Sequence, residues 1–244
     1  MKRRTDLEQV KAVAIALLLT EIHKTEFSPA VVQHPFTSSG IVPLRKDGQM
    51  QIADITQDEN ALKQWQDTMT QMINAARKPF DIYMMVNKPY ALTFLKYSSP
   101  YLTASELGKI LASAWMRSEN PNMDPNVSQS KLIALFKKAD PRYLMDSEEQ
   151  LQLAELSDPV TVYRGVTSVN RSRVHAMSWT LNPETAKWFA HRFGEHGIMY
   201  EAKIQKAHIL ALFNGRNESE IVVDPSFLMN IEEVQEPSEA LTMS

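Results

Sequence analysis

The sequence predicts an α+β protein, in which a mostly helical region precedes small antiparallel sheets. Capping signals followed by apolar residues at helical spacing recur before residue 157. Short alternating apolar runs, joined by tight turns, fill the chain after residue 160. The chain also has only 7 glycines and no Gly-rich turn between a strand and a helix. This absence argues against a dinucleotide-binding Rossmann unit and a P-loop.

Composition narrows the class of protein. With 244 residues and 43% hydrophobic content, the chain is able to bury a substantial core, as one large domain or two small ones. The net charge of −3 provides no basic field for nucleic acid. The absence of Cys excludes a disulfide framework, a Cys nucleophile and thiolate metal sites. It fits a reducing compartment, so we expect a cytoplasmic location, of the producing cell or of a host, although a Cys-free secreted protein is also compatible.

The first 19 residues have some features of a targeting signal. Met1 to Arg4 is basic and Ala12 to Leu19 is apolar, but no small-residue cleavage site follows. The apolar run is also shorter than the roughly 20 residues that span a bilayer. Thr5-Asp6-Leu7-Glu8 is instead a capping box. We therefore predict a buried helix here and no membrane partner.

Helix-start signals organise the rest of the first half. Thr56-Gln57-Asp58-Glu59 is a second capping box, and the apolar residues that follow keep helical spacing. Thr103-Ala104-Ser105-Glu106 opens a third helix, and further helices are expected around residues 130–138 and 147–156. The secondary structure of two stretches is not determined by the sequence pattern. Residues 27–54 have no clear assignment, and residues 80–86 fit either a strand or a short buried helix.

The end of the chain reads as consecutive strands, whose short connections favour antiparallel pairing. Asn182-Pro183-Glu184 combines an N-cap, a proline at the first helical position and an early acid, which predicts one helix among the strands. One face of that helix carries Ala186, Phe189, Ala190 and Phe193. The predicted strands are Val160–Tyr163, Ala176–Thr180, Ile198–Ile204, Ile209–Phe213, Glu218–Val223 and Leu228–Val234.

Three short polar motifs lie in or beside these strands. They are Val162-Tyr163-Arg164-Gly165, Ser178-Trp179-Thr180 and Asn217-Glu218-Ser219-Glu220-Ile221-Val222-Val223. Because side chains alternate between the faces of a strand, Ser178 and Thr180 point one way and Trp179 the other. By the same rule Glu218 and Glu220 share a face. The arginine, the hydroxyl pair and the carboxylate pair are therefore predicted to converge on one cleft.

A metal site is not expected. His191, Glu195 and His196 lie close together in the sequence, but they match neither His-Glu-x-x-His nor His-x-x-Glu-His. We interpret them as polar groups at the end of a helix.

The three motifs, in this order, resemble those of the mono-ADP-ribosyltransferases of the Arg-Ser-Glu type with a Glu-x-Glu motif. The resemblance covers residues 160–225 and extends to the preceding helices, because that family places a helical region ahead of the arginine strand. It implies an enzyme that cleaves NAD between nicotinamide and ribose and transfers ADP-ribose to a protein side chain. It also implies a core of two small antiparallel sheets at residues 98–244, after a mostly helical region at residues 1–97.

The resemblance implies catalytic roles for both glutamates. Glu220 takes the position of the carboxylate that stabilises positive charge on the ribose and hydrogen-bonds a ribose hydroxyl. Glu218 aligns and partly deprotonates the accepting group, which in members with Glu at this position is commonly an arginine. The protein substrate is not identified, since members include toxins, phage-encoded modifiers of host proteins and endogenous regulators.

The remaining motif residues are implied to bind NAD, which is a substrate here. Arg164 offers a planar fork for the diphosphate. Gly165 lets backbone amides approach the nicotinamide. Ser178 holds Glu220 or the ribose, and Thr180 supports the same strand face. Phe189 lies where the family often keeps an aromatic of the nicotinamide pocket, although its place in the helix stripe favours core packing.

The sequence departs from the family pattern at two positions, where Trp179 replaces a small residue and Thr180 replaces a serine. Two alternatives to a transferase remain. A NAD glycohydrolase would use water as the acceptor and release free ADP-ribose. A partner-binding protein with an inert cleft would show no stabilisation by NAD.

Overall fold

The computed structural model describes residues 4–46, 48–118, 121, 125–194, 197–215 and 217–234. The chain divides into two compact units, Met1–Leu144 and Met145–Ser244. The boundary implied by the family resemblance, after residue 97, lies within the first unit, one residue before the end of the helix Ala91–Ser98. Among the described residues, no helix is both long and apolar enough to cross a membrane.

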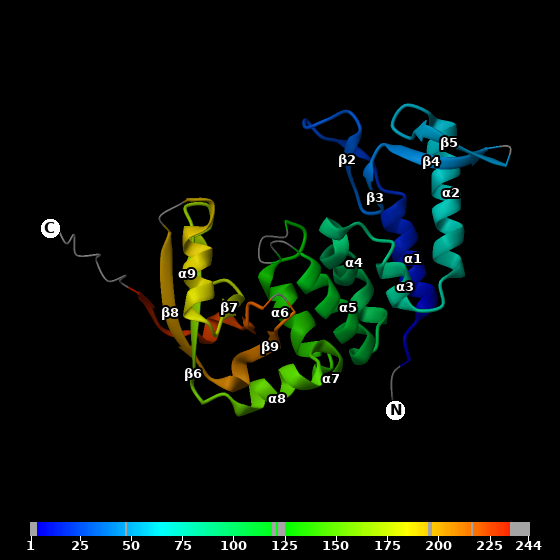
Figure 1. The fold of residues 1–244 in the computed structure, drawn as a ribbon. Helices are drawn as coiled ribbons and strands as arrows, with labels where there is room; N and C mark the ends of the chain where they lie inside the picture. The colour runs from blue at the N-terminus through cyan, green and yellow to red at the C-terminus, as the bar shows by residue number, and fades with distance from the viewer. Residues whose placement is uncertain are drawn as a thin grey trace. The chain divides into compact units, whose positions relative to one another are not determined.

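The first unit is mostly helical (Figure 1). Its central helix α5 contacts α3, α4, α6 and α7. Trp115 of α5 is fully buried, and its ring meets Phe136 of α6 edge-on at 5.0 Å between centroids. The helices are α1 (Leu7–Leu18), α2 (Glu59–Ala75), α3 (Pro79–Tyr83), α4 (Ala91–Ser98), α5 (Ala104–Arg117), α6 (Gln129–Lys138) and α7 (Pro141–Leu144), with 3-10 turns η1 (Lys88–Tyr90) and η2 (Ser99–Tyr101).

Among the described residues, four strands lie within residues 27–54, the stretch that the sequence left unassigned, and a fifth strand precedes it. Three form a small antiparallel sheet and two form a hairpin whose inner residues, Val42 and Leu44, are buried where β4 contacts α2. Residues 80–86, for which the sequence allowed either a strand or a short helix, contain part of helix α3 and no strand. The strands are β1 (His23–Lys24), β2 (Val31–His34), β3 (Thr37–Ser39), β4 (Ile41–Lys46) and β5 (Gln49–Asp54).

Three helix starts were predicted in the first half of the chain, and two of them are wrong by one or two residues. The N-cap of α1 is Asp6 and not Thr5, and that of α2 is Asp58 and not Thr56. In each case an aspartate nearer to the helix accepts the free backbone N–H groups, and the threonine hydroxyl bonds elsewhere. A run that contains both Thr and Asp offers two caps, and the sequence alone does not choose between them.

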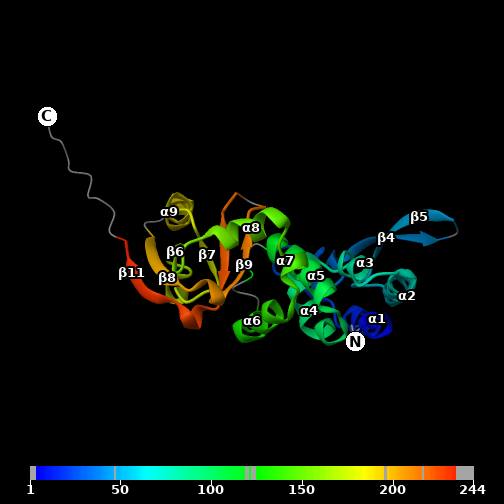
Figure 2. The same ribbon diagram turned by 90° about the horizontal axis from the view of Figure 1, so that it is seen from below.

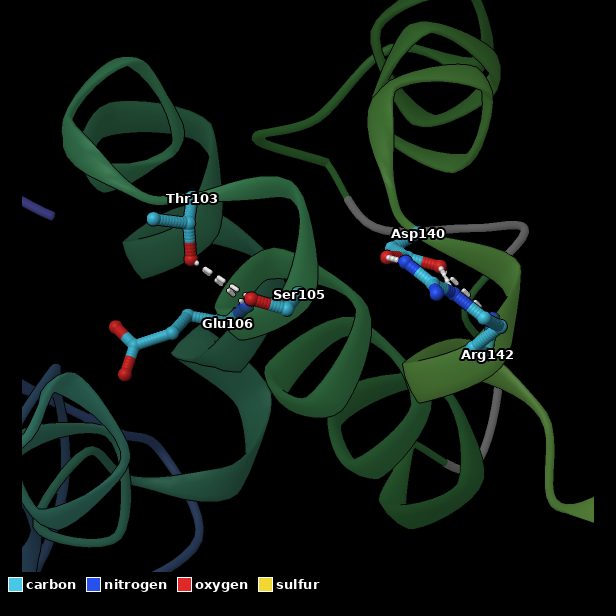
Figure 3. Close-up of polar contacts among 5 residues, drawn as sticks. All are labelled: Thr103, Ser105, Glu106, Asp140 and Arg142. Atoms are coloured by element: carbon cyan, nitrogen blue, oxygen red, sulfur yellow. Dashed lines mark hydrogen bonds and ion pairs between the residues drawn. The ribbon is translucent and has the colours of Figure 1, made fainter. Parts of the chain in front are cut away.

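The third predicted helix start is correct, as the N-cap of α5 is Thr103 (Figure 3). Its hydroxyl accepts the backbone N–H of Glu106 at 3.2 Å, while the Glu106 carboxylate accepts from the hydroxyl of Thr5 at 3.0 Å. Figure 3 also shows Asp140 paired with Arg142. The hydrogen bond from Arg142 lowers the pKa of the Asp140 carboxyl. Because this pair is local and exposed, we attribute little stability to it.

The second unit contains one antiparallel sheet of six strands, in the order β11-β8-β6-β7-β10-β9 (Figure 2). The family resemblance implied two small sheets. The structure joins two three-stranded halves by one register pair, Tyr163 with Thr180. The elements are α8 (Ser147–Glu155), β6 (Val160–Val166), η4 (Arg171–Arg173), β7 (Ser178–Thr180), α9 (Pro183–His191), η5 (Arg192–Gly194), β8 (Ile198–Ile204), η6 (Lys206–His208), β9 (Ile209–Phe213), β10 (Glu220–Val223), η7 (Pro225–Phe227) and β11 (Met229–Glu233).

Sequence periodicity located all six strands, but the bounds of four differ from the predicted ones. Strand β6 continues to Val166, β7 begins at Ser178, β11 covers Met229–Glu233, and the difference in β10 concerns a motif. Strands β8 and β9 match their predicted bounds, and α9 begins after its predicted N-cap Asn182. Strand β10, however, begins at Glu220 and not at Glu218. Asn217 and Ser219 have positive φ angles of 55° and 44°, which breaks the extended backbone before Glu220. The prediction that Glu218 and Glu220 share a face assumed a continuous strand over both residues, and the structure has no strand at Glu218.

A buried histidine couples the stability of the first unit to pH. His34 of β2 is 0% exposed, its Nδ1 accepts the backbone N–H of Phe36 at 3.1 Å, and its Nε2 lies 3.2 Å from the carbonyl oxygen of Leu18. Because Nδ1 accepts, Nε2 carries the proton of a neutral ring and donates to Leu18. Burial lowers the pKa of His34, against the opposing effect of its backbone hydrogen bonds.

We expect the free energy of unfolding to fall as the pH drops below about 6.5, the unfolded pKa of histidine. The folded state favours neutral His34, so the stabilisation is complete above that pH and declines toward the lowered folded pKa, by at most about 1.4 kcal/mol per pH unit. Urea unfolding at a series of pH values measures this slope. His34→Gln should reduce it, and His175→Gln, at an exposed histidine of the second unit, should not. An unchanged slope in His34→Gln would contradict the assignment.

Candidate functional site

The candidate site lies where the paired strands β6 and β7 separate. Beyond the pair Tyr163 with Thr180, no further register pair joins these strands in the described chain. Leu181 N–H donates to the carbonyl of Ser219, just before β10, and the Met177 carbonyl accepts from Val223 of β10. By alternation the carbonyl of Ser178 therefore points the other way, toward β6. The Arg164 guanidinium donates to that carbonyl. A side chain of β6 therefore bonds to β7 where the backbones have separated.

A hydroxyl–carboxylate pair lies on the other side of β7. Ser178 Oγ donates to Glu220 Oε1 at 2.5 Å, a length typical of a charge-assisted hydrogen bond. Pairing of β10 with β7 sets Glu220 opposite Thr180 and Val222 opposite Ser178, so these side chains share one face as predicted. Glu220 is only 3% exposed. The structure thus brings together Arg164, Ser178 and Glu220 from three strands.

Arg164 lies in an environment that disfavours its charge. Burial lowers its pKa to about 10, the nearby Glu220 carboxylate opposes that effect, and the positive charge of Arg192 adds to it. The guanidinium still remains protonated at neutral pH. Its Nε is buried, and no atom among the described residues accepts a hydrogen bond from it. Such an orphaned donor is suited to an anionic ligand oxygen.

Arg192, which follows α9, belongs to no motif recognised in the sequence. Its guanidinium lies 5.2 Å from the ring centroid of Phe189, in cation–π contact, and its charge acts on Arg164. The sequence feature that could have identified Arg192 is its position three residues after Phe189, because residues three apart on a helix share a face. Arg192 therefore extends the positive charge of the site toward α9.

Phe189 is half-buried, whereas Ala186 and Ala190 of the same helix are fully buried. The ring of Phe189 also meets Trp188 edge-on at 5.0 Å, and Trp188 is 63% exposed. Phe189 thus lies at the margin of the core, in contact with a cation of the site. The predicted stripe also included Phe193, whose side chain lies outside the described residues.

Thr180 is linked to the backbone of Glu218. The Thr180 hydroxyl donates to the backbone carbonyl of Glu218 at 2.5 Å and accepts the backbone N–H of Asn182 at 3.0 Å. Thr180 therefore holds the segment that leads into β10. Glu218 precedes that strand and is half-buried.

Gly165 has a structural role that differs from the one implied by the family. A Cβ built there would lie 2.0 Å from the carbonyl oxygen of Ala186 and 2.5 Å from the backbone nitrogen of Ala190. The backbone of α9 thus packs directly on this glycine. Figure 1 shows α9 beside β6 and β8, two of the strands that it contacts. This contact sets the distance between α9, with Phe189, and the strand that carries Arg164.

The described residues contain no group of three or more His, Asp or Glu placed to hold a metal ion. His191 Nδ1 lies 2.9 Å from the carbonyl oxygen of Lys187 in its own helix. Glu195 and His196 lie outside the described residues.

The arrangement is a buried carboxylate, fixed by a hydroxyl, beside two guanidinium groups. It is able to bind an anion and to stabilise positive charge that develops next to the carboxylate. Comparison of the chain with protein families, curated proteins and solved structures found no match.

We expect Gly165→Ala to lower the free energy of unfolding by about 1–3 kcal/mol, because the new methyl group meets backbone atoms of α9 that cannot move independently. Urea unfolding measures the loss. Gly40→Ala is the control, since the nearest atom there is a side-chain methyl of Thr56, at 2.7 Å, which has more freedom to shift. An equal loss in the two variants would contradict tight packing of α9 on Gly165.

Proposed function

We propose that this protein is a mono-ADP-ribosyltransferase that cleaves NAD at the nicotinamide–ribose bond and transfers ADP-ribose to a protein side chain, with arginine as the acceptor. The proposal depends chiefly on one observation, the 2.5 Å hydrogen bond from Ser178 to the buried Glu220 beside Arg164. These residues lie far apart in the sequence and belong to the motifs that resemble this family.

The arrangement of the second unit adds support. Three-stranded halves, β11-β8-β6 and β7-β10-β9, meet at one register pair, and the site lies at that junction. A family core of two small antiparallel sheets would need such a junction. The proposed fold is therefore an ADP-ribosyltransferase-type core with flanking helices.

Glu220 supplies the electrostatic stabilisation in this proposal. Cleavage of the bond between nicotinamide and ribose develops positive charge on the sugar, and a fixed carboxylate lowers the energy of that charge. The hydrogen bond from Ser178 fixes the carboxylate before substrate binds. Because Glu220 is buried, little water competes for its charge.

Arg164 and Arg192 provide the anion-binding part. Two neighbouring guanidinium groups repel each other, and a bound diphosphate would relieve that repulsion. The buried Nε of Arg164, which has no acceptor among the described residues, would gain one in a phosphate oxygen. The donor set therefore fits the diphosphate of NAD, and Phe189 would flank it through its contact with Arg192.

Glu220→Gln should lower the rate of ADP-ribose transfer by about 10²–10³-fold, because it removes the charge that stabilises the ribose. The amide oxygen is still able to accept from Ser178, so the fold should persist. Labelled NAD and a cell lysate provide the assay, with circular dichroism to check folding. Glu232→Gln, an exposed acid of the same sheet, is the matched control. A fully active Glu220→Gln variant would refute this role for Glu220.

Glu218→Ala should reduce transfer to protein more than hydrolysis of NAD, since Glu218 acts on the acceptor and Glu220 on the ribose. Protein-bound label and free ADP-ribose, measured in the same reaction, separate the two steps. Equal losses would argue against the acceptor-side role. Free ADP-ribose as the sole product of the unmodified protein, across lysates, would favour the glycohydrolase alternative.

A further inference from the structure

A buried acid of α8 contacts the segment that leads to Glu218. Glu149 is 8% exposed, and each of its carboxylate oxygens accepts one backbone N–H. Oε2 accepts from Asp146 at 2.9 Å, which completes the capping box of α8. Oε1 accepts from Asn214 at 2.9 Å, a residue 65 positions later in the chain. Helix capping explains the first bond but not the second.

The same segment is held at both ends. At its start, Asn214 also donates from Nδ2 to Gln152 Oε1 at 2.7 Å, and its carbonyl accepts the backbone N–H of Asn217 at 2.8 Å. At its end, Thr180 bonds to the carbonyl of Glu218, and Leu181 N–H donates to the carbonyl of Ser219 at 3.1 Å. Glu218 thus lies between one anchor on α8 and another on β7.

This anchoring matters because the described residues of the segment, 214–215 and 217–219, belong to no strand. Glu218 precedes β10, and the positive φ angles of Asn217 and Ser219 are tolerated only where the surroundings determine them. The Glu149 carboxylate makes a charge-assisted bond in a buried place, and such bonds are stronger than neutral ones. Replacing one carboxylate oxygen by an amide nitrogen would remove the acceptor of the part-buried backbone N–H of Asn214 or of Asp146.

We propose that Glu149 is a positioning residue that sets where Glu218 stands, and that it thereby controls how ADP-ribose is divided between the protein acceptor and water. This inference rests on the proposed function. In transfer, the bond from ribose to nicotinamide breaks, with its electron pair leaving on nicotinamide. A bond from ribose to the acceptor nitrogen forms, and the proton lost from the guanidinium passes through Glu218 to solvent. In hydrolysis, water takes the place of the acceptor.

The test compares Glu149→Gln with Glu148→Gln, which removes the same charge from the neighbouring, exposed position of α8. Labelled NAD and polyarginine serve as probes, and the ratio of polymer-bound label to free ADP-ribose is the readout. We expect this ratio to fall by about 10- to 100-fold in Glu149→Gln, because a small displacement of an aligning group costs that much. Glu148→Gln should leave it unchanged. A purely structural loss would lower both products together and would not move the ratio.

If Glu149→Gln fails to fold, Gln152→Leu takes its place, because it removes the partner of Asn214 Nδ2 and leaves the carboxylate intact. Gln152→Leu should also lower the ratio of polymer-bound label to free ADP-ribose. A ratio equal to that of the unmodified protein, in whichever of the two variants folds, overturns the positioning role while the proposed function stands. An unmodified protein that neither labels polyarginine nor releases ADP-ribose overturns both.

Discussion

The parting of β6 from β7 after one pair of residues is the constraint on which the candidate site depends. A continuous ladder would use the carbonyl of Ser178 for a backbone bond and would leave no place for a guanidinium. Because the strands separate, Arg164 bonds to this carbonyl, and its charge comes to lie near the Glu220 carboxylate. The irregularity of the sheet is thus what allows a half-buried cation and a buried acid to lie close together.

Each of these groups is stabilised by a different neighbour. Ser178 holds Glu220, the Ser178 carbonyl holds Arg164, and α9 brings Arg192 beside Phe189. The distance of α9 from the sheet is in turn set by Gly165, since any larger residue would meet the helix backbone. Two features that look unrelated in the sequence, a glycine after the arginine and a helix after the hydroxyl strand, are therefore parts of one packing arrangement.

Much of the second unit could be predicted from sequence. Apolar alternation located β8 and β9 at their observed bounds, and the Asn-Pro-Glu signal located the start of α9. These elements are determined by neighbours in the sequence. The start of β10 and the caps of α1 and α2 were predicted wrongly, because a positive φ or the choice between two capping side chains depends on contacts with distant residues. The same holds for Arg192, whose relation to Arg164 is visible only across elements.

By itself the sequence determined that the chain is α+β, that a strand-rich end follows a helical region, and that Ser178 and Thr180 share a strand face. These properties follow from periodicity and capping, which act over a few residues. Only the tertiary structure decided that Glu218 leaves the strand, that Glu149 and Thr180 hold its segment, and that Arg164 meets the carbonyl of Ser178. Those outcomes depend on which backbone groups remain unpaired once the strands assemble, and no local pattern carries that information.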